Sequence, residues 1–294
     1  MQPPEEAGAG ATLRCWGTRG SIPSPGPRTA RYGGNTTCVE IRAGASRLVF
    51  DAGSGMRLLG QELEARNHTL TTPIFLTHFH WDHIQGFPFF PPLYAPDQAL
   101  HIIGPAQNGI SVQSLFAGQM GPIYFPVPFS AVAADLTFGH LNEGSWQGQG
   151  FSLRAMRVRH PSYVVGYRVE VGGQIICFIP DNELEGTDES LEPGWRNRLL
   201  NFVAGADLLV HDAMYTDEEY EHRAGWGHST FRQTVRLARE AGVGKLLFFH
   251  HDPERTDEEL DEIVQRVQEE VLAAGGSLEV GAAQEGRDVT LREG

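Results

Sequence analysis

The chain has 294 residues and carries 23 Lys and Arg against 37 Asp and Glu, which gives a net charge of −14. That length can bury a sizeable core, and 40% hydrophobic with 20% charged residues excludes a largely disordered chain. The acidic balance argues against a nucleic-acid binder, because phosphate contacts need a basic face.

The three cysteines of the chain are far apart, and residues 1–10 contain no basic start and no apolar run. Scattered cysteines in odd number indicate reduced thiols in the cytosol rather than a disulfide framework. The chain contains no stretch of 18 apolar residues, the length that would suggest a membrane span. We therefore expect a cytoplasmic protein without membrane contact, with a disordered tail over 1–10 and a single domain over 11–294.

Short β-like runs open the folded part of the chain. Leu13–Trp16, Thr37–Arg42 and Arg47–Phe50 are separated by turn signals, which predicts an antiparallel meander. A helix over Gly53–Ala65 is expected to follow.

Five later runs of strand length are apolar, β-branched or aromatic, and each is followed at once by His or Asp. These runs are Pro73–Thr77, Phe151–Arg159, Gln174–Pro180, Ala206–Val210 and Lys245–Phe249. The residues that follow them are His78, His160, Asp181, His211 with Asp212, and His250 with His251. Strand ends converge at one edge of a sheet, where α/β folds place their sites, so the pattern predicts a site there.

Two segments, 87–96 and 121–129, are rich in aromatic residues and proline. Proline excludes them from regular interiors. They fit either a lid or substrate wall beside a site, or a packed loop that covers a sheet.

Two helices near the C-terminal end have clear boundaries. Phe231–Ala241 follows Ser229–Thr230 as N-cap candidates and stops before a glycine. A capping box over Thr256–Glu259 opens the second helix, whose apolar stripe runs up to Gly275. Strands and helices without a regular βαβ alternation favour α/β layers over a doubly wound sheet.

The segment Thr77–His83 reads THFHWDH, with three histidines and one aspartate directly after an apolar strand. In a strand or tight loop alternate residues share a side, so His78 and His80 can bind one ion. Asp82 and His83 then turn toward a neighbouring position. Imidazoles with one carboxylate are preferred ligands of Zn²⁺ and similar metals, so this cluster predicts a metal site.

The same motif, preceded by FDAG at Phe50–Gly53, resembles the metallo-β-lactamase superfamily. His160, Asp181 and His250 follow in the order typical of that superfamily. The resemblance covers essentially Leu13 to the end. It implies an α/β fold, a four-layer αββα sandwich with the metal site at the edge of its two sheets.

The resemblance also implies two divalent metal ions, expected to be Zn with Mn as the alternative. The implied ligands are His78, His80 and His160 for one metal, Asp82, His83 and His250 for the other, and Asp181 as the bridge. His251 is a rival to His250, because strand alternation lets only one of them face the metals. Asp51 and His211 are expected to orient ligands rather than to bind metal.

Two further motifs narrow the resemblance to the tRNase Z and phosphodiesterase branch. They are HDAMY at His211–Tyr215 and GHST at Gly227–Thr230. The resemblance implies that His228 contacts the scissile phosphate or protonates the leaving oxygen, and that Asp212 orients His228. Asp212 stands where this branch usually has glutamate, which shortens the reach of the pair. The implied catalytic residues are Asp82, His228 and Asp212.

The activity implied is hydrolysis of a phosphodiester by attack of a metal-bridging hydroxide. The charge of −14 and the lack of a basic insertion favour a small cyclic nucleotide or cyclic phosphate, so nucleic acid is not the expected substrate. The alternatives are a tRNase Z-like RNA endonuclease and a thioester or lactam hydrolase of the same superfamily. Besides the substrate, a second copy of the chain is a candidate partner, as a homodimer.

Overall fold

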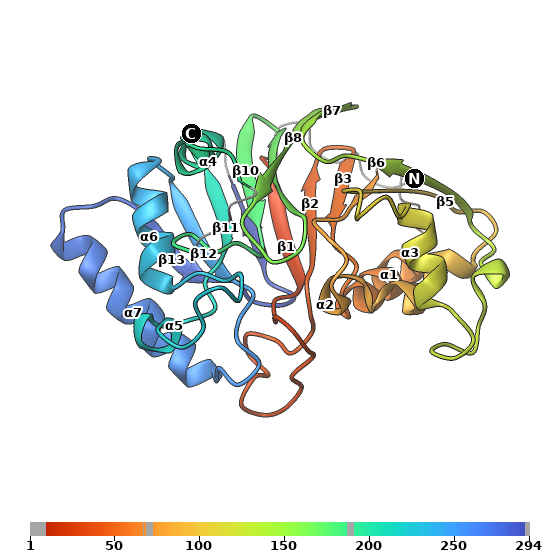
Figure 1. The fold of residues 1–294 in the computed structure, drawn as a ribbon, viewed down its shortest axis with the longest axis horizontal. Coiled ribbons are helices and arrows are strands. Elements are labelled where there is room, and N and C mark those ends of the chain that lie inside the picture. The colour runs from red at the N-terminus through yellow and green to blue at the C-terminus, as the bar shows by residue number, and fades with distance from the viewer. Residues whose placement is uncertain (1–9, 67, 69–72, 187–190, 292–294) are drawn as a thin grey trace.

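The structure is a computed structural model that describes residues 10–66, 68, 73–186 and 191–291. Within these residues the strands form two seven-stranded sheets, which face each other in the middle of the molecule (Figure 1). Residues 1–9, almost all of the predicted tail, lie outside the described residues.

The first sheet contains the predicted meander. Its strands in spatial order are β14 (Asp288–Thr290), β1 (Thr12–Gly17), β2 (Cys38–Ala43), β3 (Ser46–Phe50), β4 (Ile74–Phe75), β5 (Ala99–Gly104) and β6 (Asp135–His140). β1, β2 and β3 pair antiparallel, as predicted, whereas β3 to β6 run parallel to one another.

The second sheet contains the other strands that end in site residues. Its order is β13 (Glu279–Ala282), β12 (Lys245–Phe249), β11 (Leu208–Asp212), β10 (Gln174–Ile179), β9 (Val164–Val171), β8 (Phe151–Val158) and β7 (Gly144–Gly148). β10 to β13 are parallel, so their C-terminal ends meet at one edge.

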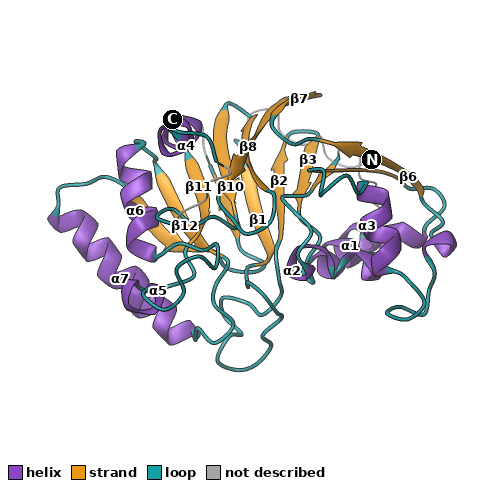
Figure 2. Ribbon diagram, viewed as in Figure 1, coloured by secondary structure: helices purple, strands orange, loops and turns teal. Residues whose placement is uncertain are grey.

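Helices cover the outer face of each sheet, as Figure 2 shows. The helices are α1 (Met56–Ala65), α2 (Trp81–Ile84), α3 (Val112–Gln119), α4 (Trp195–Val203), α5 (Asp217–Tyr220), α6 (Phe231–Glu240) and α7 (Asp257–Ala273). α1 and α3 lie on the side of the first sheet, and α4, α6 and α7 on the side of the second (Figure 2). The predicted four-layer αββα sandwich is confirmed. In the described part of the chain, no helix has both the length and the apolar character to cross a bilayer.

Three apolar cores lie between these layers. The central core joins the facing sides of the two sheets and includes Phe50 and Phe75 from the first sheet and Tyr167 and Phe178 from the second. The other two cores lie between each sheet and its helices. The sheets are therefore locked face to face, which fixes the strand ends relative to one another.

The segment 87–96 forms two short 3-10 turns, Phe87–Phe89 and Pro91–Tyr94, next to α1. Phe87, Phe90 and Leu93 are buried in the outer core of the first sheet, which favours the packed loop over the lid for this segment. In 121–129, by contrast, Ile123 and Tyr124 are exposed. A lid role for these segments remains a prediction.

The capping box of α7 is present as the sequence predicts. Thr256 accepts a hydrogen bond from the Glu259 amide at 3.2 Å, and the Glu259 carboxylate accepts one from the Thr256 amide at 2.7 Å. These bonds satisfy amides at the start of the helix that have no partner within it.

Thr256→Ala should lower the free energy of unfolding by about 1 kcal/mol, because one of these helix-start amides loses its acceptor. Urea denaturation at constant metal concentration measures the loss. Thr256→Ser keeps the hydroxyl and should stay near the wild-type value. An unchanged stability in the alanine variant would contradict the importance of the cap.

Candidate metal centre

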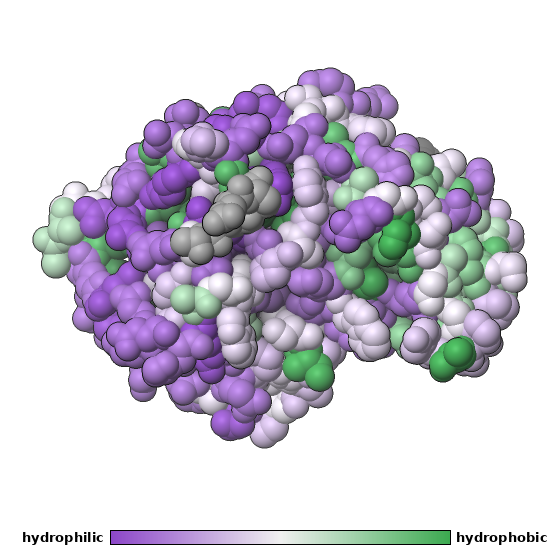
Figure 3. Space-filling view, in the orientation of Figure 1, coloured by the Kyte–Doolittle hydropathy of each residue, from purple (hydrophilic) through white to green (hydrophobic). Residues whose placement is uncertain are grey.

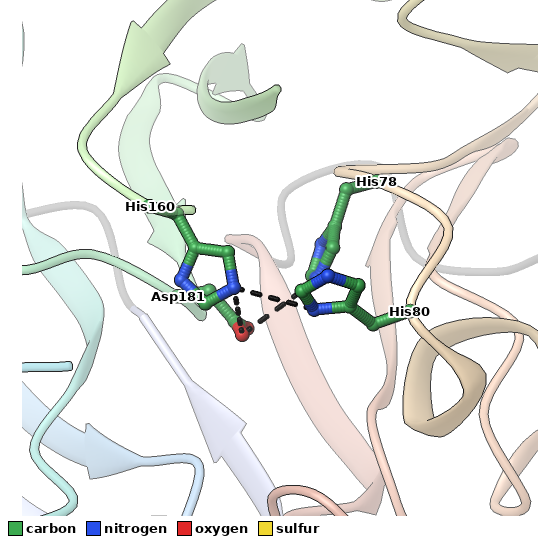
Figure 4. Close-up of side chains that lie close together, drawn as sticks. All are labelled: His78, His80, His160 and Asp181. Carbon is green, nitrogen blue, oxygen red and sulfur yellow. Dashed lines mark hydrogen bonds and ion pairs between the residues drawn. The ribbon is translucent and has the colours of Figure 1, made fainter. Parts of the chain in front are cut away.

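Three strand ends bring four of the predicted ligands together at one edge of the sandwich. His78 and His80 follow β4, His160 follows β8, and Asp181 follows β10. In Figure 4, His78 and His80 approach from one side and His160 and Asp181 from the other. Donor atoms of these four residues all lie within 4.8 Å of one another.

The histidines of this first ligand set face each other through their ring nitrogens. His160 Nε2 lies 3.3 Å from His80 Nδ1. His78 Nε2 and His160 Nε2 each lie 3.8 Å from Asp181 Oδ2. The side chain of His80 is exposed, whereas the other three are buried, so the set opens to solvent at His80.

A second ligand set consists of Asp82, His83 and His250, which are all buried. Asp82 and His83 belong to the short helix α2, while His250 follows β12. His250 Nε2 lies 3.0 Å from Asp82 Oδ2 and 3.4 Å from His83 Nε2. These three donors surround a single point beside the first set.

Asp181 lies between the two sets. Its Oδ2 faces His78 and His160, as given above, whereas its Oδ1 lies 3.0 Å from His83 Nε2 and 3.5 Å from His250 Nε2. One carboxylate thus offers one oxygen to each set. This is the geometry that a carboxylate bridging two cations requires.

The protonation states of the first set suit a cation. Burial opposes the ionised form of Asp181, but the surrounding imidazoles outweigh it and hold the pKa of that carboxyl well below its usual range. Burial, with the charge of His83, holds the pKa of His78 well below its usual range, and burial lowers the pKa of His160 to about 3. His78 Nε2 is buried without a hydrogen-bond partner. Neutral imidazoles beside an ionised carboxylate are what a divalent metal binds.

The second set attracts positive charge. Burial opposes the charged form of His83, but Asp181, Asp82 and Asp51 outweigh it and raise the pKa of His83 well above its usual range. A bound cation would supply that positive charge in place of the proton. The residues of both sets therefore fit divalent metal ions.

Contacts behind the ligands fix the orientation of their rings. The His83 ring lies with Nδ1 2.9 Å from Asp51 Oδ2, and His160 Nδ1 lies 2.9 Å from the Gly227 carbonyl. His78 Nδ1 lies 3.1 Å from Thr77 Oγ1. Each contact occupies Nδ1 and leaves Nε2 for the cluster. Asp51 thus fixes the ring of His83, a predicted ligand.

The structure separates the two neighbouring histidines after β12. His250 points into the cluster, whereas His251 Nε2 lies 2.9 Å from the Ala283 carbonyl, away from it. His250 adopts a left-handed backbone with a φ of 58°, as does Asp51 with 60°. Gly20 packs against the His250 ring, since a Cβ there would lie 2.4 Å from His250 Nδ1.

His228 and Asp212 form a hydrogen-bonded pair beside the ligands. His228 Nδ1 lies 2.7 Å from Asp212 Oδ2, so the shorter aspartate side chain does reach the imidazole. The His228 ring stacks on His250 with centroids 4.9 Å apart. Burial opposes protonation of His228, but Asp212 outweighs it and raises the pKa of His228 to about 9. Donor atoms of His228, Asp181 and His250 also lie within 4.8 Å of one another. Because Asp212 occupies Nδ1 of His228, Nε2 is the nitrogen that His228 can offer to the cluster.

Several residues that support the site are not among those predicted from the sequence. The Ser21 amide donates to Asp82 Oδ2 at 2.8 Å, and the Asn182 amide donates to Asp212 Oδ2 at 3.0 Å. The buried Glu183 carboxylate holds the loop before His228. His211 contacts Asn182 rather than a predicted ligand, with 3.2 Å between Nε2 and Nδ2. The position of Asp181 could have suggested its two successors, Asn182 and Glu183, but nothing marks Ser21.

Comparison with known proteins places this geometry in a family. Residues 46–251 match the family model described as the β-lactamase superfamily domain. A protein named Ribonuclease Z from Exiguobacterium sibiricum is 26% identical over 268 residues, covering 76% of this chain and 85% of the relative. This similarity agrees with the resemblance to the tRNase Z and phosphodiesterase branch.

Solved structures share the fold over almost the whole chain. The metallo-β-lactamase fold protein YhfI from Bacillus subtilis superposes with a TM-score of 0.68 at 18% identity, over 96% of this chain and 99% of that one. Human tRNase Z, short form, superposes with a TM-score of 0.63 at 20% identity, over 95% and 98% of the two chains. The chain therefore belongs to the β-lactamase superfamily and is a metal-dependent hydrolase of it.

Proposed function

We propose that this hydrolase cleaves phosphodiesters with two divalent metal ions. The observation that carries the proposal is the position of Asp181, whose two oxygens face two separate ligand sets. Relatives named Ribonuclease Z support phosphodiester bonds as the reacting group over thioesters or lactams.

The first metal would be held by His78, His80, His160 and Asp181, and the second by Asp82, His83, His250 and Asp181. A donor set rich in imidazole suits zinc, with manganese as the alternative. Two such ions, when bound, supply Lewis acidity at the phosphate and lower the pKa of water.

His228 is suited to act as the general acid. With its pKa raised to about 9 by Asp212, the imidazole stays protonated at neutral pH. Its Nδ1 is occupied by Asp212, which leaves Nε2 to give a proton to the leaving oxygen. Asp212 holds the ring in that orientation and stabilises its positive charge.

Two substrate classes are supported by different observations. The net charge of −14 favours a small cyclic nucleotide or cyclic phosphate. The relatives named Ribonuclease Z favour RNA, and they do not fit the expectation from charge that the substrate is not a nucleic acid. A side-by-side assay with a cyclic nucleotide and a precursor tRNA distinguishes the two.

His250→Ala should lower the bound metal from about two to about one per chain, because it removes one ligand of the second set. Metal analysis by mass spectrometry after gel filtration provides the count. His251→Gln is the matched control, since His251 contacts a carbonyl outside the cluster, and it should keep the full metal content. Loss of metal from the control alone would show that the ligand assignment is wrong.

His228→Ala should lower turnover of bis(p-nitrophenyl) phosphate by about 10²–10⁴-fold while metal content stays unchanged, because a general acid is lost. Steady-state kinetics on metal-loaded protein tests this. A fully active variant would contradict the role of His228. Loss of metal together with activity would instead identify His228 as a ligand. Absence of turnover by the wild-type protein on every phosphodiester would refute the proposed function.

The pH dependence follows from the protonated form of His228. Since a general acid works only while protonated, kcat/KM should fall as pH rises through about 9. Asp212→Asn removes the charge that raises this pKa, so the alkaline limb should move to lower pH. Asp217→Asn, at a partly exposed position paired with Arg232, should leave the profile unchanged. An alkaline limb that Asp212→Asn does not move would contradict the pairing.

A further inference from the structure

The tryptophans of the chain fall into two groups by exposure. Trp16 and Trp195 are buried, and Trp146 is half-buried, which is usual for so large an apolar side chain. Trp81 and Trp226 are 77% and 61% exposed. In Figure 3, hydrophilic residues cover most of the surface over α5, α6 and α7, and strongly hydrophobic residues form only separate spots on the face shown. The two exposed tryptophans therefore need a specific reason.

Trp81 is adjacent in sequence to two residues of the candidate metal centre. It lies between His80 and Asp82, and it is the first residue of α2. His80 is the exposed member of the first ligand set, so the open side of the centre lies next to Trp81. The exposed indole therefore belongs to the residue that separates a member of the first ligand set from a member of the second.

Trp226 belongs to a loop that contacts the same centre and follows β11 of the second sheet. It precedes Gly227, whose carbonyl lies 2.9 Å from His160 Nδ1, and it stands two residues before His228. The His160 and His80 rings are 5.0 Å apart between centroids. Trp81 therefore adjoins His80 in sequence, and Trp226 precedes the residue whose carbonyl contacts His160.

The loop that carries Trp226 is held rigidly. The buried Glu183 carboxylate accepts hydrogen bonds from the Gly225 amide at 2.7 Å and the Gly227 amide at 3.0 Å. It also accepts one from the Tyr220 hydroxyl at 2.6 Å. The amides on both sides of Trp226 are thus bound to one buried group. Because the backbone on both sides of Trp226 is already ordered, this loop loses little entropy on binding a ligand.

A third exposed apolar residue adjoins the centre. Ile22, 58% exposed, follows Ser21, whose amide donates to Asp82 Oδ2 at 2.8 Å. Three segments far apart in sequence thus each carry one exposed apolar side chain within two residues of a residue that belongs to the centre or contacts it. Ile22, Trp81 and Trp226 are called the apolar rim below.

We propose that the apolar rim binds the nucleobase of the substrate, with the base stacked on Trp81 or Trp226 while its phosphate lies at the metal centre. The proposal rests on the proposed phosphodiesterase function and narrows its substrate to small nucleotides rather than cyclic ribose phosphates without a base. Indole faces stack on any base, so the rim selects for a base without selecting which one.

The test compares two substrates with the same reacting group, a cyclic adenosine monophosphate and a cyclic ribose phosphate without a base. Trp81→Ala and Trp226→Ala should each lower the kcat/KM for cyclic adenosine monophosphate, relative to that for the cyclic ribose phosphate, by about tenfold or more. Trp226→Phe keeps an aromatic face and should retain most of the ratio. Leu272→Ala, which removes an exposed apolar side chain from α7, is the control and should leave the ratio unchanged.

A second readout keeps the rim and the chemistry apart. Calorimetric titration with AMP and with ribose 5-phosphate measures binding by metal-loaded protein even without turnover. Weaker AMP binding in Trp226→Ala, with ribose 5-phosphate unaffected, supports the rim even if no phosphodiester is cleaved. The proposal would be overturned if the tryptophan variants changed neither the ratio of kcat/KM values nor the binding of AMP relative to ribose 5-phosphate. The rim would then have another occupant, such as a second copy of the chain.

Discussion

The architecture of the centre depends on one buried carboxylate, that of Asp181. It is almost fully buried and lies within 4 Å of four imidazoles, those of His78, His83, His160 and His250. An ionised carboxylate in such a place is costly unless positive charge compensates it, and the surrounding imidazoles supply that charge only while they are protonated. A divalent cation bound among these side chains would supply it without protonating them.

That arrangement requires precise placement of segments distant in sequence. The predicted ligands lie in the segments that follow β4, β8, β10 and β12, and these strands belong to both sheets. The central core fixes the sheets against each other, and contacts from Asp51 and Gly227 then set individual rings. The fold provides the coarse position and hydrogen bonds provide the fine one, as a metal site needs.

The sequence was most informative where chemistry is local. The motif THFHWDH and the His or Asp residues after apolar strands predict the ligands. They do so because the ends of such strands meet at one edge of a sheet, which does not depend on details elsewhere in the fold. Edge strand β7, whose residues read GSWQG, has no apolar alternation and was not predicted. Ser21 acts through a backbone amide that only folding brings near Asp82, so no pattern could reveal it.

The left-handed backbone of His250 and Asp51 has a consequence for engineering. Such a conformation costs a non-glycine residue about 1 kcal/mol or more, so both positions store strain that the packed sheets must offset. Glycine would relieve it but would remove a predicted ligand or the group that orients His83. Selection for thermal stability alone would therefore favour loss of the centre, and stabilised variants should be sought at positions remote from it.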